Sequence, residues 1–257
     1  MASGVVVAQL ITELLENNHS KELLTTILSE NQLKNVFVGG DTRFDRVKAI
    51  CEAKKEIILA ENFKNKQPLL IVGSSWDEDL AVLVPFINDF VFPLKIIIAP
   101  HEINQQKIKE LRQKINKKTT LFSENNQNDN QNNSLENIHK FDVLIIDNVG
   151  MLSSLYAYAD FAFVGGAFKQ GLHNILEAAT FGLPIFFGNQ KYQKYQEATD
   201  LIVQKGAFAV ANNKDFETQF SALYQNKIAY EQAQKACLHY VNANLGATKL
   251  IFEKIKI

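Results

Sequence analysis

Short apolar runs alternate with longer amphipathic segments along most of this chain. The runs are rich in β-branched residues and are apolar throughout, which is typical of parallel strands covered on both faces. Strands that alternate with helices predict βαβ units with right-handed crossovers. We therefore expect an α/β fold with a doubly wound, mostly parallel, Rossmann-like sheet. The expected strands are Val36–Val38, Leu69–Val72, Lys95–Ala99, Thr119–Phe122, Val143–Ile146, Phe161–Val164, Pro184–Phe187 and Phe208–Val210.

Helical periodicity fills the segments between these strands and closes the chain. The expected helices are Trp76–Phe90, Ile103–Ile115, Leu152–Ala159, Asn174–Phe181, Tyr195–Lys205, Lys214–Tyr224, Tyr230–Asn244 and Ala247–Lys256.

Two regions stand apart from this alternation. Val5–Asn17 and Ser20–Ser29 have helical patterns, so we expect residues 1–35 to form a helical lead-in and residues 36–257 one Rossmann-like domain. Asn125–Asn133 contains only Asn, Gln and Asp. Such a segment cannot bury apolar surface, so it predicts a flexible surface loop.

Composition narrows the classes of function. With 46% hydrophobic and 21% charged residues the chain is ordinary for a globular protein. Its net charge of -1 lacks the basic footprint of a nucleic-acid binder. Cys51 and Cys237 make neither a disulfide framework nor a metal site, which favours a reducing cytoplasm. No apolar run approaches the ~18 residues that span a bilayer, so we expect a soluble or surface-attached protein.

Small, polar or ionisable residues follow five of the expected strands. In a doubly wound sheet, ligands bind beyond the carboxyl ends of the strands. We therefore expect these five strand ends to meet at one rim of the sheet. The segments that follow them are Gly39–Arg46, Gly73–Trp76, Pro100–Glu102, Asp147–Gly150 and Gly165-Gly166.

The strongest local signal runs from Tyr158 to Ala179. A buried strand leads into Gly165-Gly166, and we expect the next helix to carry His173 and Asn174 in its first turn. Glycines allow close backbone approach, and a helix start favours an anion such as phosphate. Glu177 follows His173 by four residues, on the same helix face, where its carboxylate could hold ribose hydroxyls. The segment thus predicts a nucleotide-sugar site.

Each other candidate has a simpler structural interpretation beside the functional one. Arg43 could clamp a phosphate, or pair with a neighbouring aspartate on the surface. Ser74 or Ser75 could bond a phosphate or sugar, or cap the next helix. His101 could contact substrate, or be merely packed, and Asn174 is also a good helix cap.

Several familiar motifs are missing from the sequence. It contains no Gly-x-Gly-x-x-Gly fingerprint, no Walker loop and no Gly-x-Ser-x-Gly elbow. Neither does any His, Cys and Asp cluster have metal-ligand spacing. We therefore expect neither a metal nor a cofactor.

Six blocks in a fixed order resemble the carboxy-terminal half of 3-deoxy-D-manno-octulosonic acid (Kdo) transferases. The resemblance runs from about Gly39 to the end of the chain. The blocks are Gly40–Val47, Gly73–Trp76, Ala99–Glu102, Asp147–Leu152, Ala159–Gly166 and His173–Ala179.

The resemblance implies one half of a two-domain, metal-independent GT-B-type glycosyltransferase. Such an enzyme transfers Kdo from CMP-Kdo to a lipid A precursor in lipopolysaccharide synthesis. It works at the cytoplasmic face of a Gram-negative inner membrane. The donor would bind in this half, while the acceptor and the catalytic base would belong to an amino-terminal domain outside this chain. We thus expect an excised domain or a truncated gene product.

Some positions depart from the family pattern. Asn148 and Met151 replace residues of the usual Asp-Thr-x-Gly-Glu block, and Leu172 stands where a second glycine is usual. Two alternatives stay open: a GT-B transferase that uses a UDP-sugar, and a non-catalytic module of the same fold that binds a partner chain. The expected donor-binding residues are Arg43, Ser74, Ser75, Pro100, His101, Asn148, Gly150, Met151, Gly165, Gly166, His173, Asn174 and Glu177.

Overall fold

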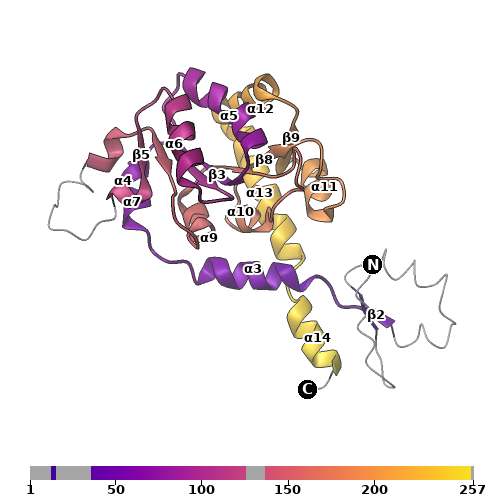
Figure 1. Cartoon of the computed structure of the whole chain (residues 1–257). Coiled ribbons are helices and arrows are strands. Elements are labelled where there is room, and N and C mark those ends of the chain that lie inside the picture. Colours follow the sequence, from indigo (N-terminus) through magenta and orange to yellow (C-terminus); the bar gives the residue numbers. More distant parts are fainter. Residues whose placement is uncertain (1–12, 16–35, 126–136, 256–257) are drawn as a thin grey trace. The chain divides into compact units, whose positions relative to one another are not determined.

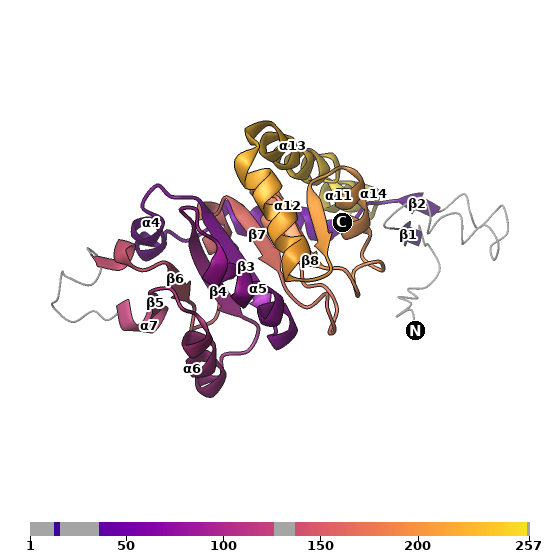
Figure 2. The same ribbon diagram turned by 90° about the horizontal axis from the view of Figure 1, so that it is seen from above.

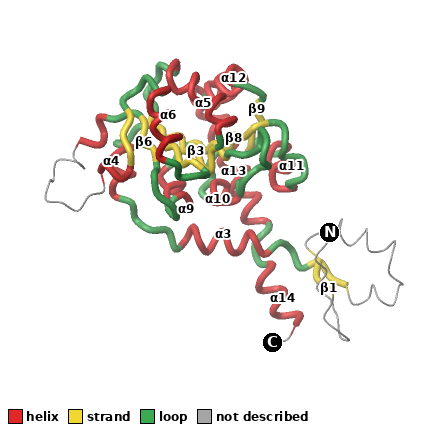
Figure 3. Tube along the Cα trace, viewed as in Figure 1, coloured by secondary structure: helices red, strands yellow, loops and turns green. Residues whose placement is uncertain are grey.

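The structure is a computed structural model that describes residues 13–15, 36–125 and 137–255 (Figures 1 and 3). The chain divides into two compact units. One unit combines residues 1–49 with 241–257, and the other spans residues 50–240. Each unit contains a parallel sheet of its own.

The larger unit is built on a seven-stranded sheet whose neighbouring strands are all parallel. The order is β5-β6-β4-β3-β7-β8-β9. From β3 the chain winds toward one edge, and from β7 it winds toward the other, so the direction reverses between β3 and β7 (Figure 2). The predicted doubly wound parallel sheet is confirmed. Its strands are β3 Leu69–Ser75, β4 Lys95–Pro100, β5 Thr119–Leu121, β6 Val143–Ile145, β7 Phe161–Val164, β8 Ile185–Gly188 and β9 Ala207–Val210.

Helices cover both faces of this sheet. Leu70 and Val72 of β3 join a core with α5 and α12, whereas Gly73 packs on the other face under Tyr156. Within the described residues, no helix is long and apolar enough to cross a membrane. The helices are α4 Ile58–Lys64, α5 Asp77–Asp89, α6 Gln105–Lys114, α7 Phe122–Asn125, α9 Leu152–Leu155, α10 Leu176–Thr180, α11 Gln196–Val203, α12 Asn213–Gln225 and α13 Lys227–Ala243, with 3-10 turns at Ile138–Lys140 and Tyr156–Tyr158.

Aromatic rings fill the core beneath α5 and α12. The Phe86 ring on α5 lies 4.7 Å from Phe216 and 5.1 Å from Phe220, both on α12 and both edge-on. Phe220 also lies 4.7 Å from Phe161 of β7. Edge-on and tilted ring pairs add to the burial of apolar area, so this cluster anchors β7 against the helical layer.

The smaller unit contains two short strands and the end of the chain. β1 Glu13–Leu15 pairs in parallel with β2 Val36–Val38. Helix α3, Thr42–Glu52, starts in this unit, and α14, Ala247–Ile255, lies in it. Asp45 of α3 accepts hydrogen bonds from the backbone of Gly246 and Thr248, each at 2.7 Å, which ties α3 to the start of α14.

The structure bears on several expectations for residues 1–38 and for the Asn-rich loop. Within Val5–Asn17 the structure describes only Glu13–Leu15, a strand and not the expected helix, because it pairs with β2. Ser20–Ser29 and most of the Asn-rich loop lie outside the described residues. Val36–Val38 is a strand as predicted, but it is not part of the seven-stranded sheet. An apolar strand pattern does not specify its pairing partner. The boundary between residues 35 and 36 stays a prediction.

Candidate functional site

The carboxyl ends of β3 and β7 lie side by side where the winding of the sheet reverses. This is the position at which open α/β sheets bind ligands. β3 ends in Ser74 and Ser75, and β7 is followed by Gly165 and Gly166. Ser74 has a left-handed backbone (φ 51°), and the pairing of β3 with β4 shifts register there. As a result Ser75 pairs with Pro100 at the end of β4.

Asp79 of α5 connects the two sides of this crevice. It is fully buried, and its Oδ2 accepts the backbone N–H of Trp76 and that of Gly166, both at 2.9 Å. Burial raises the pKa of Asp79 to about 6, although these two hydrogen bonds lower it. Sequence reasoning missed Asp79. Its place three residues after the helix cap, where acidic side chains often reach back to the cap, could have revealed it.

The glycine turn is packed too closely for any side chain. A Cβ on Gly165 would lie 2.4 Å from the Ser74 carbonyl oxygen and 2.6 Å from Asp79 Oδ2. The amide of Gly165 donates to the Gly73 carbonyl at 2.9 Å, and that of Gly166 to Asp79. Because both amides are already engaged, the turn fixes the crevice, and neither amide is free to donate to a ligand.

Three aromatic side chains gather beside the turn. The Trp76 indole N–H donates to His173 Nε2 at 2.9 Å, and the planes of the two rings are nearly parallel (8°). His101 stacks on both, with ring centroids 4.3 Å from Trp76 and 4.5 Å from His173. Burial, and then the neighbouring His101, lower the pKa of His173. Since Nε2 is an acceptor, neutral His173 carries its proton on Nδ1 and offers a hydrogen-bond donor there.

Helix α10 begins later than expected. His173 and Asn174 precede it, and its first residue is Leu176. The Asn174 side chain accepts the N–H of Leu176 at 3.1 Å, which is a capping bond. The prediction that both residues lie in the first turn is therefore wrong. The short polar Asn174 side chain competes for backbone amides and favours a position before the helix.

Glu177 does lie in the first turn of α10, and the structure gives it two side-chain partners. Its Oε2 accepts the Ser153 hydroxyl of α9 at 2.7 Å, and its Oε1 accepts Asn174 Nδ2 at 3.3 Å. These contacts hold the carboxylate half-buried beside the strand ends. A partner with hydroxyl groups, such as a ribose, is compatible with an oriented carboxylate of this kind.

The remaining candidates occupy other segments. Asn148, Gly150 and Met151 lie in the loop between β6 and α9. This loop leads into α9, whose Ser153 contacts Glu177. Gly150 has φ 85° and open space around it. Arg43 belongs to the smaller unit, where its guanidinium pairs with Asp41 at 2.7 Å, as its simpler interpretation predicted. The larger unit thus brings together Ser74, Ser75, Pro100, His101, Gly165, Gly166, His173, Asn174 and Glu177 through bonded or packed neighbours.

Solved structures define the class of this fold. No family model matches the chain. The chain superposes on the C-terminal CMP-Kdo binding domain of WaaA from Acinetobacter baumannii with a TM-score of 0.58 and 20% identity, over 72% of this chain and 97% of that domain. Anabaena Alr3699/HepE in complex with UDP-glucose gives a TM-score of 0.53 and 12% identity, over 95% of this chain and 62% of that one. The fold is the Rossmann-like α/β domain of GT-B glycosyltransferases.

Sequence comparison points to one group within that class. The 3-deoxy-D-manno-octulosonic acid transferase of Rickettsia bellii is 27% identical over 234 residues, which are 89% of this chain and 53% of the relative. The predicted resemblance to Kdo transferases is therefore confirmed. The chain spans about half the length of the first curated relatives that it matches.

Proposed function

We propose that this chain binds CMP-Kdo and acts as the donor half of a Kdo transferase. The acceptor would be a lipid A precursor held by a second domain, at the cytoplasmic face of a Gram-negative inner membrane. The similarity to a Kdo transferase along 89% of the chain carries this proposal. The crevice between β3 and β7 supports it, because its position is that of a nucleotide site in this fold.

The chemistry that this half supplies is electrostatic. When the bond between Kdo and CMP breaks, negative charge develops on the departing phosphate, and donors aimed at it lower the barrier. With the glycine amides engaged, the donors in this proposal are the His173 Nδ1–H and the Ser74 hydroxyl, both of the larger unit. Glu177, already oriented by Ser153, would accept the ribose hydroxyls.

A nucleotide panel tests the proposal first. A ligand that binds only the folded protein stabilises it by about 2.7 kcal/mol at 100 times its Kd. CMP should therefore raise the melting temperature, whereas UDP and UMP should not. Stabilisation by uridine nucleotides alone would favour the UDP-sugar alternative. No stabilisation by any nucleotide, together with a stable complex with another polypeptide, would favour the partner-binding module.

One substitution then tests the assigned carboxylate. Glu177→Ala should weaken CMP binding by about 1–3 kcal/mol, the effect of losing a charge-assisted hydrogen bond. Glu217→Ala on α12 is an exposed matched control and should leave the affinity unchanged. Calorimetry measures the affinities. Unchanged CMP binding in Glu177→Ala would refute this assignment of the site even if CMP binds the wild-type chain.

A further inference from the structure

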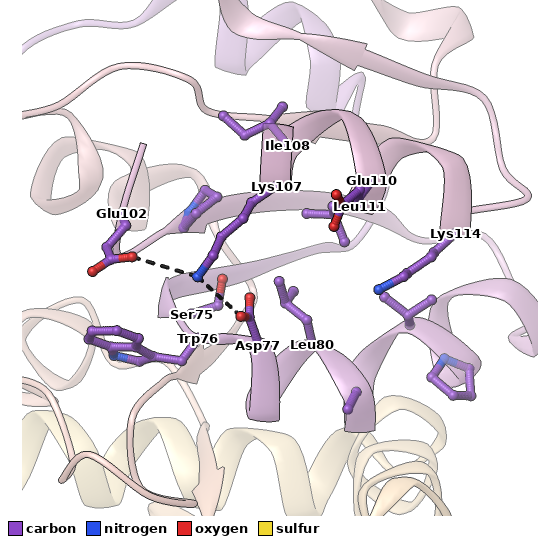
Figure 4. A pocket seen from close by; sticks show the side chains of 14 residues that line it. Ser75, Trp76, Asp77, Leu80, Glu102, Lys107, Ile108, Glu110, Leu111 and Lys114 are labelled. Carbon is purple, nitrogen blue, oxygen red and sulfur yellow. Dashed lines mark ion pairs between the residues drawn. The ribbon is translucent and has the colours of Figure 1, made fainter. Parts of the chain in front are cut away.

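A cavity of about 450 Å³ lies between α5 and α6, beside the ends of β3 and β4 (Figure 4). Leu80, Val84 and Pro85 of α5 form one wall, and Ile108 and Leu111 of α6 form the other. A volume of this size is in the range of small-molecule sites, and an apolar wall with few polar groups is typical of them. Ser75 and Pro100, at the strand ends, line one part of it, but the proposed binding of CMP-Kdo makes no use of the apolar walls from α5 and α6.

Two polar groups in the wall of the cavity favour a hydroxyl-bearing ligand. Ser75 is 3% exposed and lines the cavity, and its Oγ has no hydrogen-bond partner among the described residues. Pro85 lacks the amide hydrogen that would pair with the carbonyl of Ala81 one turn earlier, and both residues line the cavity. A ligand hydroxyl can serve such groups as donor and acceptor.

Charged side chains surround the mouth of the cavity. Lys107 Nζ lies 3.1 Å from Asp77 and 3.6 Å from Glu102, as the dashed lines in Figure 4 show. Glu110 and Lys114 also line the cavity. Because carboxylates already neutralise Lys107, the mouth does not attract an anion. Exposed charges also disfavour contact with hydrocarbon, so a ligand enters from water and not from a bilayer.

We propose that this cavity binds a small, uncharged amphiphile, with an alkyl-sized apolar body and a hydroxyl that bonds to Ser75 Oγ. Medium-chain alcohols represent the class. The site lies on the α5–α6 side of Ser75 and is distinct from the crevice between β3 and β7.

Trp76 makes binding directly measurable, because it lines the cavity and is the only tryptophan of the chain. Titration with 1-butanol, 1-hexanol and 1-octanol should give saturable changes in its fluorescence. Each added methylene should lower Kd about threefold to fourfold until the cavity is full. Hexanoate, the charged analogue, should bind at least about tenfold more weakly than 1-hexanol, since its charge would be desolvated.

Variants locate the site. Ala81→Phe places a ring over the cavity and should abolish binding, whereas Ala222→Phe, exposed on α12 outside the cavity, should not change it. Ser75→Ala should weaken 1-hexanol about threefold to tenfold through the lost hydrogen bond. Saturating CMP should leave the 1-hexanol affinity intact. Three outcomes would each overturn the proposal. They are fluorescence changes that do not saturate, binding of 1-hexanol by Ala81→Phe as tight as by the wild type, and exclusion of 1-hexanol by CMP.

Discussion

Asp79 is the residue on which the geometry of the crevice depends most. Its Oδ2 accepts hydrogen bonds from the amides of Trp76 and Gly166, one on each side of the crevice. The other oxygen, Oδ1, has no hydrogen-bond partner among the described residues. The raised pKa, about 6 against the ordinary 3.8, means that the folded state binds this proton more tightly than the unfolded state does. The wild-type protein therefore loses stability as the pH rises from about 4 to about 6.

Asp79→Asn should remove this pH dependence. The shift in pKa corresponds to about 3 kcal/mol, so the stability of the wild type relative to the variant should fall by about that amount between pH 4 and pH 7. Urea denaturation across this range measures the difference. Asp77→Asn, exposed in the same turn, is the matched control. Parallel curves for wild type and Asp79→Asn would show that Asp79 titrates like a solvated carboxyl.

At the scale of elements, the loop after β7 depends on glycine for space more than for backbone freedom. Gly166 and Gly150 have similar positive φ values, 96° and 85°. A Cβ on Gly166 would lie 2.3 Å from the Gly171 carbonyl oxygen and 2.9 Å from the His173 ring, while nothing lies within 4 Å of one on Gly150. The two positions therefore separate backbone strain from crowding.

Gly150→Ala should lower the free energy of unfolding by about 1–2 kcal/mol, the cost of placing a Cβ on a left-handed backbone. Gly166→Ala should cost about 1–3 kcal/mol more, because the backbone of the loop has to move. Denaturant unfolding of both variants checks the order. Equal losses of stability would mean that the loop after β7 accommodates the added Cβ at little energetic cost.

The sequence predicted the strands of the larger unit well. It predicted helix α3, the pairing of β2 and the start of α10 poorly. All seven of its strands were found, since buried parallel strands are apolar throughout. Helix α3 was missed although its buried residues, Phe44, Val47 and Cys51, have helical spacing. The pairing of β2 with β1 joins residues distant in the sequence, and hydrophobic periodicity does not encode it. The late start of α10 follows from a local capping bond between Asn174 and the Leu176 amide, which hydrophobic periodicity does not encode either.

At the scale of the whole molecule, the division into two units predicts separable stability. Asp45→Ala removes the acceptor of the Gly246 and Thr248 amides, both within the smaller unit. Loss of such a cap is worth about 1–2 kcal/mol, so exchange of these two amides should accelerate about 5- to 30-fold. Amides of β3 and β7 should not change.

Hydrogen exchange followed residue by residue tests this. Glu253→Ala, exposed on α14, controls for the loss of a negative charge in the same unit. If Asp45→Ala accelerated exchange in β3 as much as at Gly246, the two units would open as a single cooperative body.

The two hydrogen bonds to one oxygen of Asp79 also affect the rate at which a ligand associates with the crevice between β3 and β7. Both walls are held at a set spacing before anything arrives, so little chain ordering has to accompany capture. The site is thus preorganised, so the association rate should be limited by encounter and orientation and not by closure of loops.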